Sequence, residues 1–160
     1  MPPIELGRLN AEPDHDFVLF LIGMRVHRLW KVNRWLPVYR AMAKLMHQLG
    51  EDRQLGLLGS HGTRHGRDIF LVQCWESEDK LMEFSRAPDH RGYWKWYNTA
   101  LNHGRDVGLW HETYRISAGS YDGCYLNMPV HGLADAVGSA RLTHTHGRRP
   151  VAAEPERPAA

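Results

Sequence analysis

The sequence predicts an α+β fold in which an antiparallel sheet carries helices on one side, arranged as a ferredoxin-like split β-α-β unit. Three observations predict it. Apolar residues recur with strand spacing in some segments and with helix spacing in others, and the two kinds of segment alternate. Glycine and proline mark the boundaries between them. A chain of 160 residues, 42% of them hydrophobic, is long enough for one domain with a single core.

The first strand and the first helix have the clearest patterns. Residues 17–26 form an almost continuous apolar run, which predicts a central strand buried on both faces. Apolar residues then recur with helical spacing over 35–50. Proline is tolerated in a first helical turn and glycine is a typical stop, so Pro37 and Gly50 fit a helix with these bounds.

A hairpin and a short helix are expected next. Strands at about 55–62 and at 68–76 flank a glycine turn, which is typical of a hairpin. The hydroxyl of Ser77 can then cap a helix over 78–86.

The remaining elements follow Pro88, which ends that short helix. A further helix is expected at roughly 89–102, with apolar residues along one stripe. A fourth strand is predicted at 107–116 and an additional strand at about 121–127.

The chain divides into three parts by composition. Residues 1–15 are polar and rich in proline, so an N-terminal arm is expected there, followed by the folded domain at 16–138. The segment 139–160 turns to Arg, His, Pro and Ala, which predicts a disordered tail. Because the strands at 17–26 and 68–76 are apolar on both faces while helices cover only one, we predict a homodimer that buries the open face.

Composition argues against several kinds of partner. The formal charge is only +2 and the basic residues are scattered, so no nucleic-acid partner is expected. The longest apolar run, 17–24, is too short to span a bilayer, so no membrane partner is expected. Two cysteines, Cys74 and Cys124, are expected as free buried thiols. The first residues lack the pattern of a signal peptide, so a cytoplasmic protein is expected.

One segment contains more titratable side chains than a structural strand needs. The run Trp-His-Glu-Thr-Tyr at 110–114 lies within an otherwise strand-like segment. Because successive side chains alternate between faces, His111 and Thr113 share one face, while Trp110, Glu112 and Tyr114 share the other. A titratable group held on a stiff strand predicts a pocket with chemical activity.

Several blocks in order resemble one known family. They are Phe-Leu-Ile-Gly-Met-Arg at 20–25, Leu-Trp-Lys-Val at 29–32, Trp-Leu-Pro-Val at 35–38, Gly-Leu-Leu-Gly at 56–59, Leu-Val-Gln-Cys-Trp at 71–75, Trp-His-Glu-Thr-Tyr at 110–114 and Asn-Met-Pro at 127–129. From about residue 17 to residue 132, the chain resembles the dimeric α+β barrel proteins related to a monooxygenase of fumagillin biosynthesis. The resemblance implies a dimeric α+β barrel, a monooxygenase-like activity and a place in secondary metabolism. It leaves the reaction open, because barrels of this kind also include heme enzymes and non-enzymatic stress proteins.

Five polar residues are candidates for catalysis. His111 could act as a general base, since the ordinary pKa of histidine lies close to neutrality. Glu112 on the other face requires a partner, for which a structural ion pair with Arg25 or Arg115 is favoured. Tyr125 and Asn127 share a strand face and could hold a substrate oxygen anion, although Asn127 also suits a strand cap before Pro129.

The fifth candidate is His90, at the start of the helix 89–102. Trp94 and Asn98 follow it at four-residue steps along roughly the same side of that helix. The resemblance implies a ligand cavity between this helix and the sheet, where His90 could act as an acid–base group; an exposed helix-start histidine is an equal alternative. Residues expected to line the pocket are Trp94, Asn98, Trp110, Tyr114 and Met24.

Three functions remain open. The leading hypothesis is a small monooxygenase-like enzyme that needs no cofactor and acts on a hydrophobic aromatic or polycyclic substrate, with His111 as base and Asn127 or Tyr125 at the oxygen anion. The second is a heme enzyme, of the dehydratase or heme-degrading type, with His90, His103 or His111 as axial ligand. The third is a non-enzymatic ligand-binding or stress module. No metal site is expected, because His61 and His65 straddle a glycine turn.

Overall fold

The computed structural model describes residues 3–11, 13–100, 105–137 and 139–141 and confirms the α+β fold. Its main sheet has the strand order β3-β4-β2-β5, with every neighbouring pair antiparallel. These strands are β2 (Phe17–Val26), β3 (Leu57–His65), β4 (Asp68–Trp75) and β5 (Val107–Ile116). Because β4 lies between the parallel strands β2 and β3, the unit that joins them through a helix is the predicted split β-α-β.

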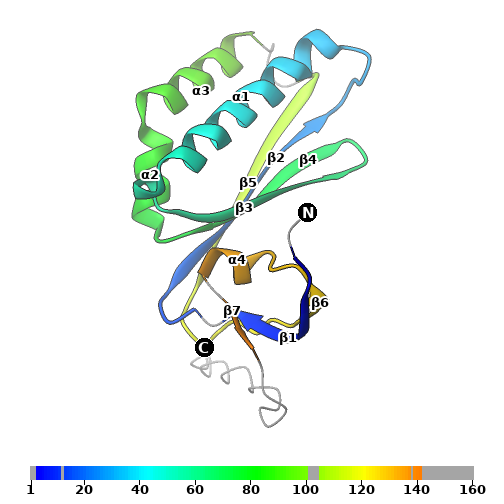
Figure 1. Cartoon of the computed structure of the whole chain (residues 1–160). Coiled ribbons are helices and arrows are strands. Elements are labelled where there is room, and N and C mark those ends of the chain that lie inside the picture. The colour runs from blue at the N-terminus through cyan, green and yellow to red at the C-terminus, as the bar shows by residue number, and fades with distance from the viewer. Residues whose placement is uncertain (1–2, 12, 101–104, 138, 142–160) are drawn as a thin grey trace, which may run out of the picture.

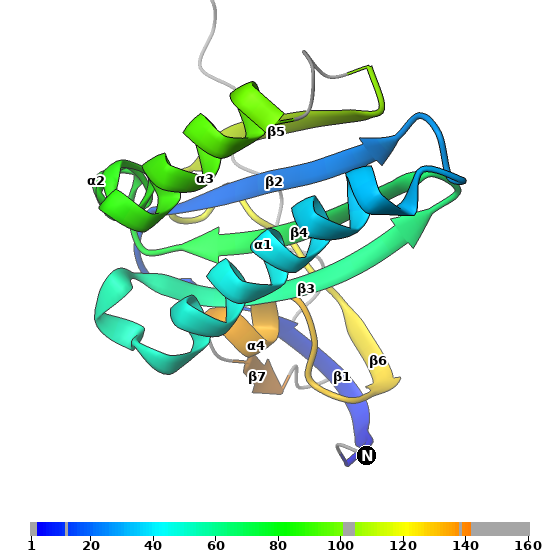
Figure 2. The same cartoon turned by 90° about the horizontal axis from the view of Figure 1, so that it is seen from above.

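Three helices cover one face of this sheet (Figures 1 and 2). They are α1 (Val32–Glu51), α2 (Glu78–Arg86) and α3 (Pro88–Ala100), and the 3-10 turn Arg53–Leu55 follows α1. As predicted, the Ser77 hydroxyl accepts a hydrogen bond from the Lys80 backbone N–H at 3.3 Å and begins α2. Helix α1 starts three residues before the predicted position, so Pro37 lies inside it and not in its first turn. Proline has no N–H, and the carbonyl of Asn33 therefore lacks its helical partner.

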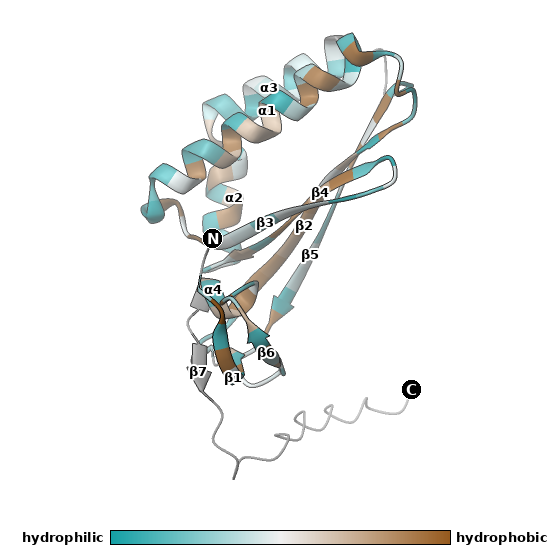
Figure 3. Cartoon of the chain, turned by 45° about the vertical axis from the view of Figure 1, so that its right-hand side comes forward, coloured by the Kyte–Doolittle hydropathy of each residue, from teal (hydrophilic) through white to brown (hydrophobic). Residues whose placement is uncertain are grey.

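The strand register decides which side chains face the helices. Ile22 of β2 pairs with His111 of β5 and with Leu71 of β4, so these three side chains share the helix-covered face. The core beneath the helices includes Met24 and Trp75, both at most 1% exposed. In Figure 3 the apolar stripes of α1 and α3 turn toward the sheet.

A second, smaller sheet packs against the opposite face. Its order is β6-β1-β7, with β1 (Glu5–Ala11) between β6 (Tyr125–Met128) and β7 (Ser139–Arg141), and α4 (Leu133–Val137) accompanies it. Phe17 and Cys74 of the main sheet form a buried cluster with Leu133 and Ala134 of α4. Figure 1 shows this unit at one end of the main sheet.

This small sheet changes the interpretation of three segments. Residues 5–11, expected only as part of an arm, form its central strand. The additional strand expected at about 121–127 begins at Tyr125 and joins the small sheet. Residues 139–141 of the expected tail are strand β7, and residues 142–160 lie outside the described part of the chain.

The small sheet leaves part of the open face uncovered. Leu21, Phe70, Val72 and Trp110 lie on that part and are half-buried. The rings of Phe70 and Trp110 approach each other across Gly23, with their centroids 5.7 Å apart. The predicted homodimer would cover this remaining apolar surface, and it stays a prediction.

Candidate functional site

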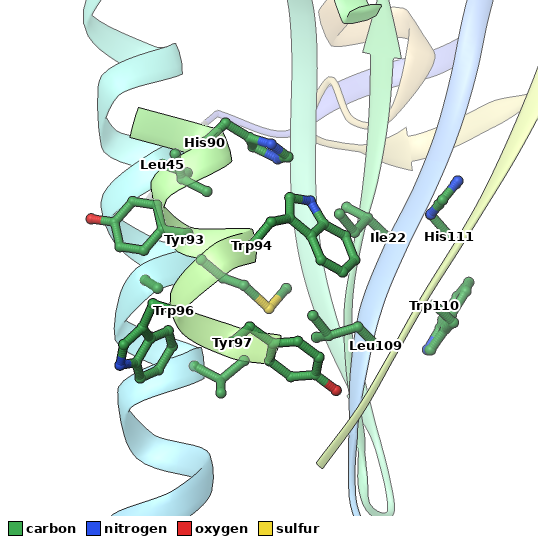
Figure 4. Close-up of a pocket in the computed structure, with 13 residues that line it drawn as sticks. Ile22, Leu45, His90, Tyr93, Trp94, Trp96, Tyr97, Leu109, Trp110 and His111 are labelled. Atoms are coloured by element: carbon green, nitrogen blue, oxygen red, sulfur yellow. The ribbon is translucent and has the colours of Figure 1, made fainter. Parts of the chain in front are cut away.

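An apolar cavity lies between α1, α3 and the main sheet (Figure 4). It has two adjoining compartments of about 100 and 300 Å³. Six residues line both compartments: Ile22, Met42, Leu45, His90, Trp94 and His111. Together the compartments reach the lower end of the range typical of small-molecule sites.

Helix α3 is held over the sheet by a half-buried tyrosine. The Tyr97 hydroxyl donates a hydrogen bond to the Val107 carbonyl at 2.8 Å, and burial raises the pKa of Tyr97. His90 and Trp94 are four residues apart and therefore share one side of α3. In Figure 4 the side chains of Trp94 and Tyr97 extend toward the sheet. This anchoring fixes the helix face that forms one wall of the cavity.

His90 is the most unusual polar group in the cavity wall. Its Nδ1 is buried and has no hydrogen-bond partner among the described residues, while the residue as a whole is half-buried. Its ring packs edge-on against Phe84, with centroids 5.6 Å apart. Burial lowers the pKa of His90, and the Ser85 backbone opposes this shift only in part. His90 is therefore neutral at physiological pH, with ring nitrogen lone-pair capacity available to a ligand.

His111 lines the cavity from β5, on the face predicted from strand alternation. Its ring lies next to Phe20, with centroids 5.6 Å apart, and the residue is exposed on the edge strand. The two histidines thus reach one cavity from different elements, His90 from the start of α3 and His111 from the middle of β5.

Glu112 does not have the predicted ion-pair partners. Arg25 binds Asp68 at 2.7 Å, and Arg115 forms two hydrogen bonds with Glu78, both at 2.6 Å. Glu112 instead accepts a hydrogen bond from the Tyr114 hydroxyl at 2.6 Å, which raises the pKa of Tyr114. Both side chains lie on the opposite face of the sheet from His111, so neither faces the cavity.

The structure places Tyr125 and Asn127 away from the cavity that His111 lines. Both belong to β6 of the small sheet, beyond the opposite face. The Tyr125 hydroxyl lies 3.0 Å from that of Tyr121. Asn127 has a φ of 51°, and its Oδ1 accepts a hydrogen bond from the Gly7 N–H at 2.9 Å. Asn127 therefore supports a strand junction, the other role that its position before Pro129 allowed.

Of the expected pocket residues, Trp94 lines both compartments. Trp110 borders only the smaller one, and its ring lies on the uncovered face of the sheet next to Phe70. Met24 is fully buried in the core next to the cavity, Tyr114 faces the other side of the sheet, and Asn98 is exposed and absent from the cavity wall. The other heme-ligand candidate, His103, lies outside the described residues.

Sequence reasoning missed a buried amide in the larger compartment. Gln73 is 3% exposed; its Oε1 accepts a hydrogen bond from Trp75 Nε1 and its Nε2 approaches Met46 Sδ, both at 3.0 Å. A single amide within the apolar run of β4 was the signal that could have identified it. The free thiols were predicted correctly, but only Cys74 is buried; Cys124 is exposed before β6.

The described residues offer neither a cluster of metal ligands nor a membrane-spanning helix. Among the described residues, no three His, Cys, Asp or Glu side chains are grouped as metal ligands would be. His61 of β3 instead stacks near His131, with ring centroids 4.8 Å apart. No helix in the described part of the chain combines the length and apolarity needed to cross a membrane.

The fold and the cavity define a ferredoxin-like α+β protein with an apolar, histidine-bearing ligand pocket between its helices and its sheet. The chain belongs to the monooxygenase af470-like family, whose model matches residues 17–133. It is 24% identical over 119 residues to monooxygenase af470 of Aspergillus fumigatus. That match covers 74% of this chain but only 41% of the relative.

Two solved structures share this fold at low sequence identity, and a third is less similar. An aldoxime dehydratase crystallised with butyraldoxime has a TM-score of 0.65 and 16% identity, over 82% of this chain and 39% of that one. A second aldoxime dehydratase structure has a TM-score of 0.65 and 17% identity, over 86% and 42%. SnoaB, a cofactor-independent oxygenase of Streptomyces nogalater, has a TM-score of 0.45 and 12% identity, over 62% and 91%.

Proposed function

We propose that the protein is a monooxygenase-like enzyme that oxidises a hydrophobic aromatic or polycyclic metabolite in this cavity, without a nucleotide cofactor. One observation carries the proposal: the half-buried, neutral imidazole of His90 has a buried nitrogen without a hydrogen-bond partner in a mainly apolar chamber. An unsatisfied buried nitrogen costs stability, and a substrate that supplies the missing hydrogen bond would recover it. Membership of a family named for a monooxygenase supports this class of reaction.

The chemistry that such a chamber supports begins with proton removal. His90 takes a proton from an acidic C–H or O–H of an electron-rich substrate, such as an anthrone. The resulting carbanion transfers one electron to O₂, and the radical pair combines to a peroxide. Loss of water then converts the CH₂ group to a carbonyl, so that one oxygen atom enters the product and the other leaves as water. The apolar walls keep bulk water from the anion.

In this proposal His90 takes the role of base that the sequence assigned first to His111, and His111 takes the oxygen-binding role expected for Asn127 or Tyr125. His111 was expected to be the base, but it is exposed on an edge strand, whereas His90 is half-buried and its buried Nδ1 has no hydrogen-bond partner. In the proposal His111 hydrogen-bonds the substrate oxygen from β5, on the wall of the cavity opposite His90. Asn127 and Tyr125 have no part, because they lie on the small sheet.

Oxygen uptake with anthrone and with a quinol as probes tests the proposal. His90→Gln should lower kcat about 100-fold or more if His90 is the base. His111→Gln should have a smaller effect, and Asn127→Ala should leave turnover unchanged. Equal turnover in the wild type and in His90→Gln would remove the assignment of the base.

The same observation favours heme binding as the second candidate function. A neutral imidazole in an apolar chamber is a suitable axial ligand, and bound heme would supply iron-centred redox chemistry. A hemin titration separates the two functions. A saturable Soret band that is lost in His90→Phe would favour heme, and a spectrum without saturable change would leave the cofactor-free reaction in place. Saturable binding of a colourless ligand with no turnover would favour a binding module.

A further inference from the structure

An outer groove runs between α1 and α3, directly outside the cavity. Its volume is about 610 Å³, and its walls are Pro37, Arg40, Ala41 and Lys44 of α1 with Pro88, Asp89, Gly92, Tyr93 and Trp96 of α3. Ala41, Tyr93 and Trp96 line both the groove and the smaller compartment of the cavity. In Figure 4 the rings of Tyr93 and Trp96 lie on the side of α3 toward α1, away from the sheet. These three residues therefore border the groove on one side and that compartment on the other.

The groove carries an unbalanced positive charge. Arg40 and Lys44 are exposed, and neither forms an ion pair with any of the described residues. They are four residues apart on one helix face, an arrangement of like charges that destabilises a helix. The carboxylate of the opposite wall, Asp89, accepts a hydrogen bond from Gln48 Nε2 at 3.1 Å. Two cations that form no ion pair with the described residues thus line a groove that adjoins the apolar cavity.

Gly92 keeps the α3 wall of this groove open. It lies inside α3, where glycine is less stable than alanine, and it has no positive φ that would require glycine. A Cβ placed there would meet no atom within 4 Å, so close packing does not require glycine either. The absence of a side chain at this position leaves free space in the groove.

We propose that this groove is the access route to the cavity, and that Arg40 and Lys44 select ligands with one anionic group beside a flat apolar body. The proposal rests on the proposed function, in which the cavity holds the substrate. The apolar body passes Tyr93 and Trp96 into the chamber, while the carboxylate, sulfonate or phenolate stays at the two cations. The substrate class is thereby narrowed from aromatic metabolites in general to anionic ones.

Two fluorescent dyes with the same ring system test the role of the charges. 8-Anilinonaphthalene-1-sulfonate carries a sulfonate, and N-phenyl-1-naphthylamine is its neutral counterpart. In the double variant Arg40→Gln/Lys44→Gln, the Kd of the sulfonate should rise roughly three- to tenfold, as expected for exposed charge pairs. The Kd of the neutral dye should not change. A matched control, Arg53→Gln/Lys95→Gln, removes one arginine and one lysine outside the groove and should change neither Kd.

A plug at Gly92 tests the route itself. Gly92→Leu should abolish saturable binding of both dyes, and Gly92→Ala should keep binding while raising thermal stability, which shows that the helix tolerates substitution. Unchanged dye binding in a folded Gly92→Leu would overturn the route. The selection of anions would be overturned if the double variant raised the Kd of both dyes or of neither. It would also be overturned if neither dye bound saturably to the wild type. If the dyes give one of these contrary results while His90→Gln loses oxygen uptake, the proposed function holds and only the access route or the anion selection is refuted.

Discussion

Replacing His90 by phenylalanine should stabilise the fold and abolish the activity proposed for the cavity. An unsatisfied buried polar atom such as His90 Nδ1 costs about 1–3 kcal/mol. Phenylalanine keeps the edge contact with Phe84, and the adjoining compartment of about 300 Å³ has room for its ring. We therefore expect the free energy of unfolding to rise by about 1–2 kcal/mol, which corresponds to roughly 2–8 °C in Tm for a chain of this length.

Urea unfolding followed by tryptophan fluorescence measures this change, and oxygen uptake is measured on the same preparations. His111→Phe is the matched control: it places the same ring on the exposed histidine of the cavity, so its stability should stay within about 0.5 kcal/mol of wild type. A His90→Phe variant that is less stable than wild type by 1 kcal/mol or more would refute the packing argument. Full activity in that variant would refute the catalytic one.

Three further predictions concern the sheet and its pH dependence. Gly23→Ala should cost about 1–3 kcal/mol in urea unfolding, because its Cβ would lie 2.6 Å from Phe70 Cβ and 2.8 Å from the Trp110 ring; a neutral result would contradict this. Val72→Asp on the uncovered sheet face should convert the predicted homodimer to a monomer in sedimentation, and a wild-type monomer at micromolar concentration would refute the dimer. Burial lowers the pKa of His61 and of His90. The unfolded chain therefore takes up these protons at a higher pH than the folded chain does, and stability should decline as pH falls below about 6.5. Replacing both histidines should flatten that part of the urea-unfolding profile, and an unchanged profile would contradict the linkage.

Local patterns in the sequence were sufficient for the main elements. Alternation predicted β5 at 107–116 with His111 and Glu112 on opposite faces, and the register confirms both. The Ser77 cap and the order of the elements of the main sheet and its three helices were also correct, whereas β1, α4 and β7 were not predicted. These features depend on residues within about ten positions of one another, so a single segment contains the information that determines them.

The candidate site could be predicted only in part. The cavity is lined by His90, His111 and Trp94, as expected from the sequence. The other candidates lie elsewhere: Tyr125, Asn127, Glu112 and Asn98. Tyr125 and Asn127 could not be separated from the cavity residues in the sequence, because a strand pattern does not show which sheet the strand joins. Gln73 and Tyr93 were missed for a related reason, since only the packing of α1 and α3 on the sheet makes them walls of the cavity and groove.

The sequence by itself determined the family, the α+β class and the faces of each strand, because side-chain period and turn residues act over short distances. Only the tertiary structure decided that residues 5–11 form a second sheet with Tyr125–Met128, a pairing across more than one hundred positions. It also decided that the His90 nitrogen is buried without a partner beside a positively charged groove. Burial and pairing are properties of what surrounds a side chain, and those surroundings come from segments far apart in the sequence.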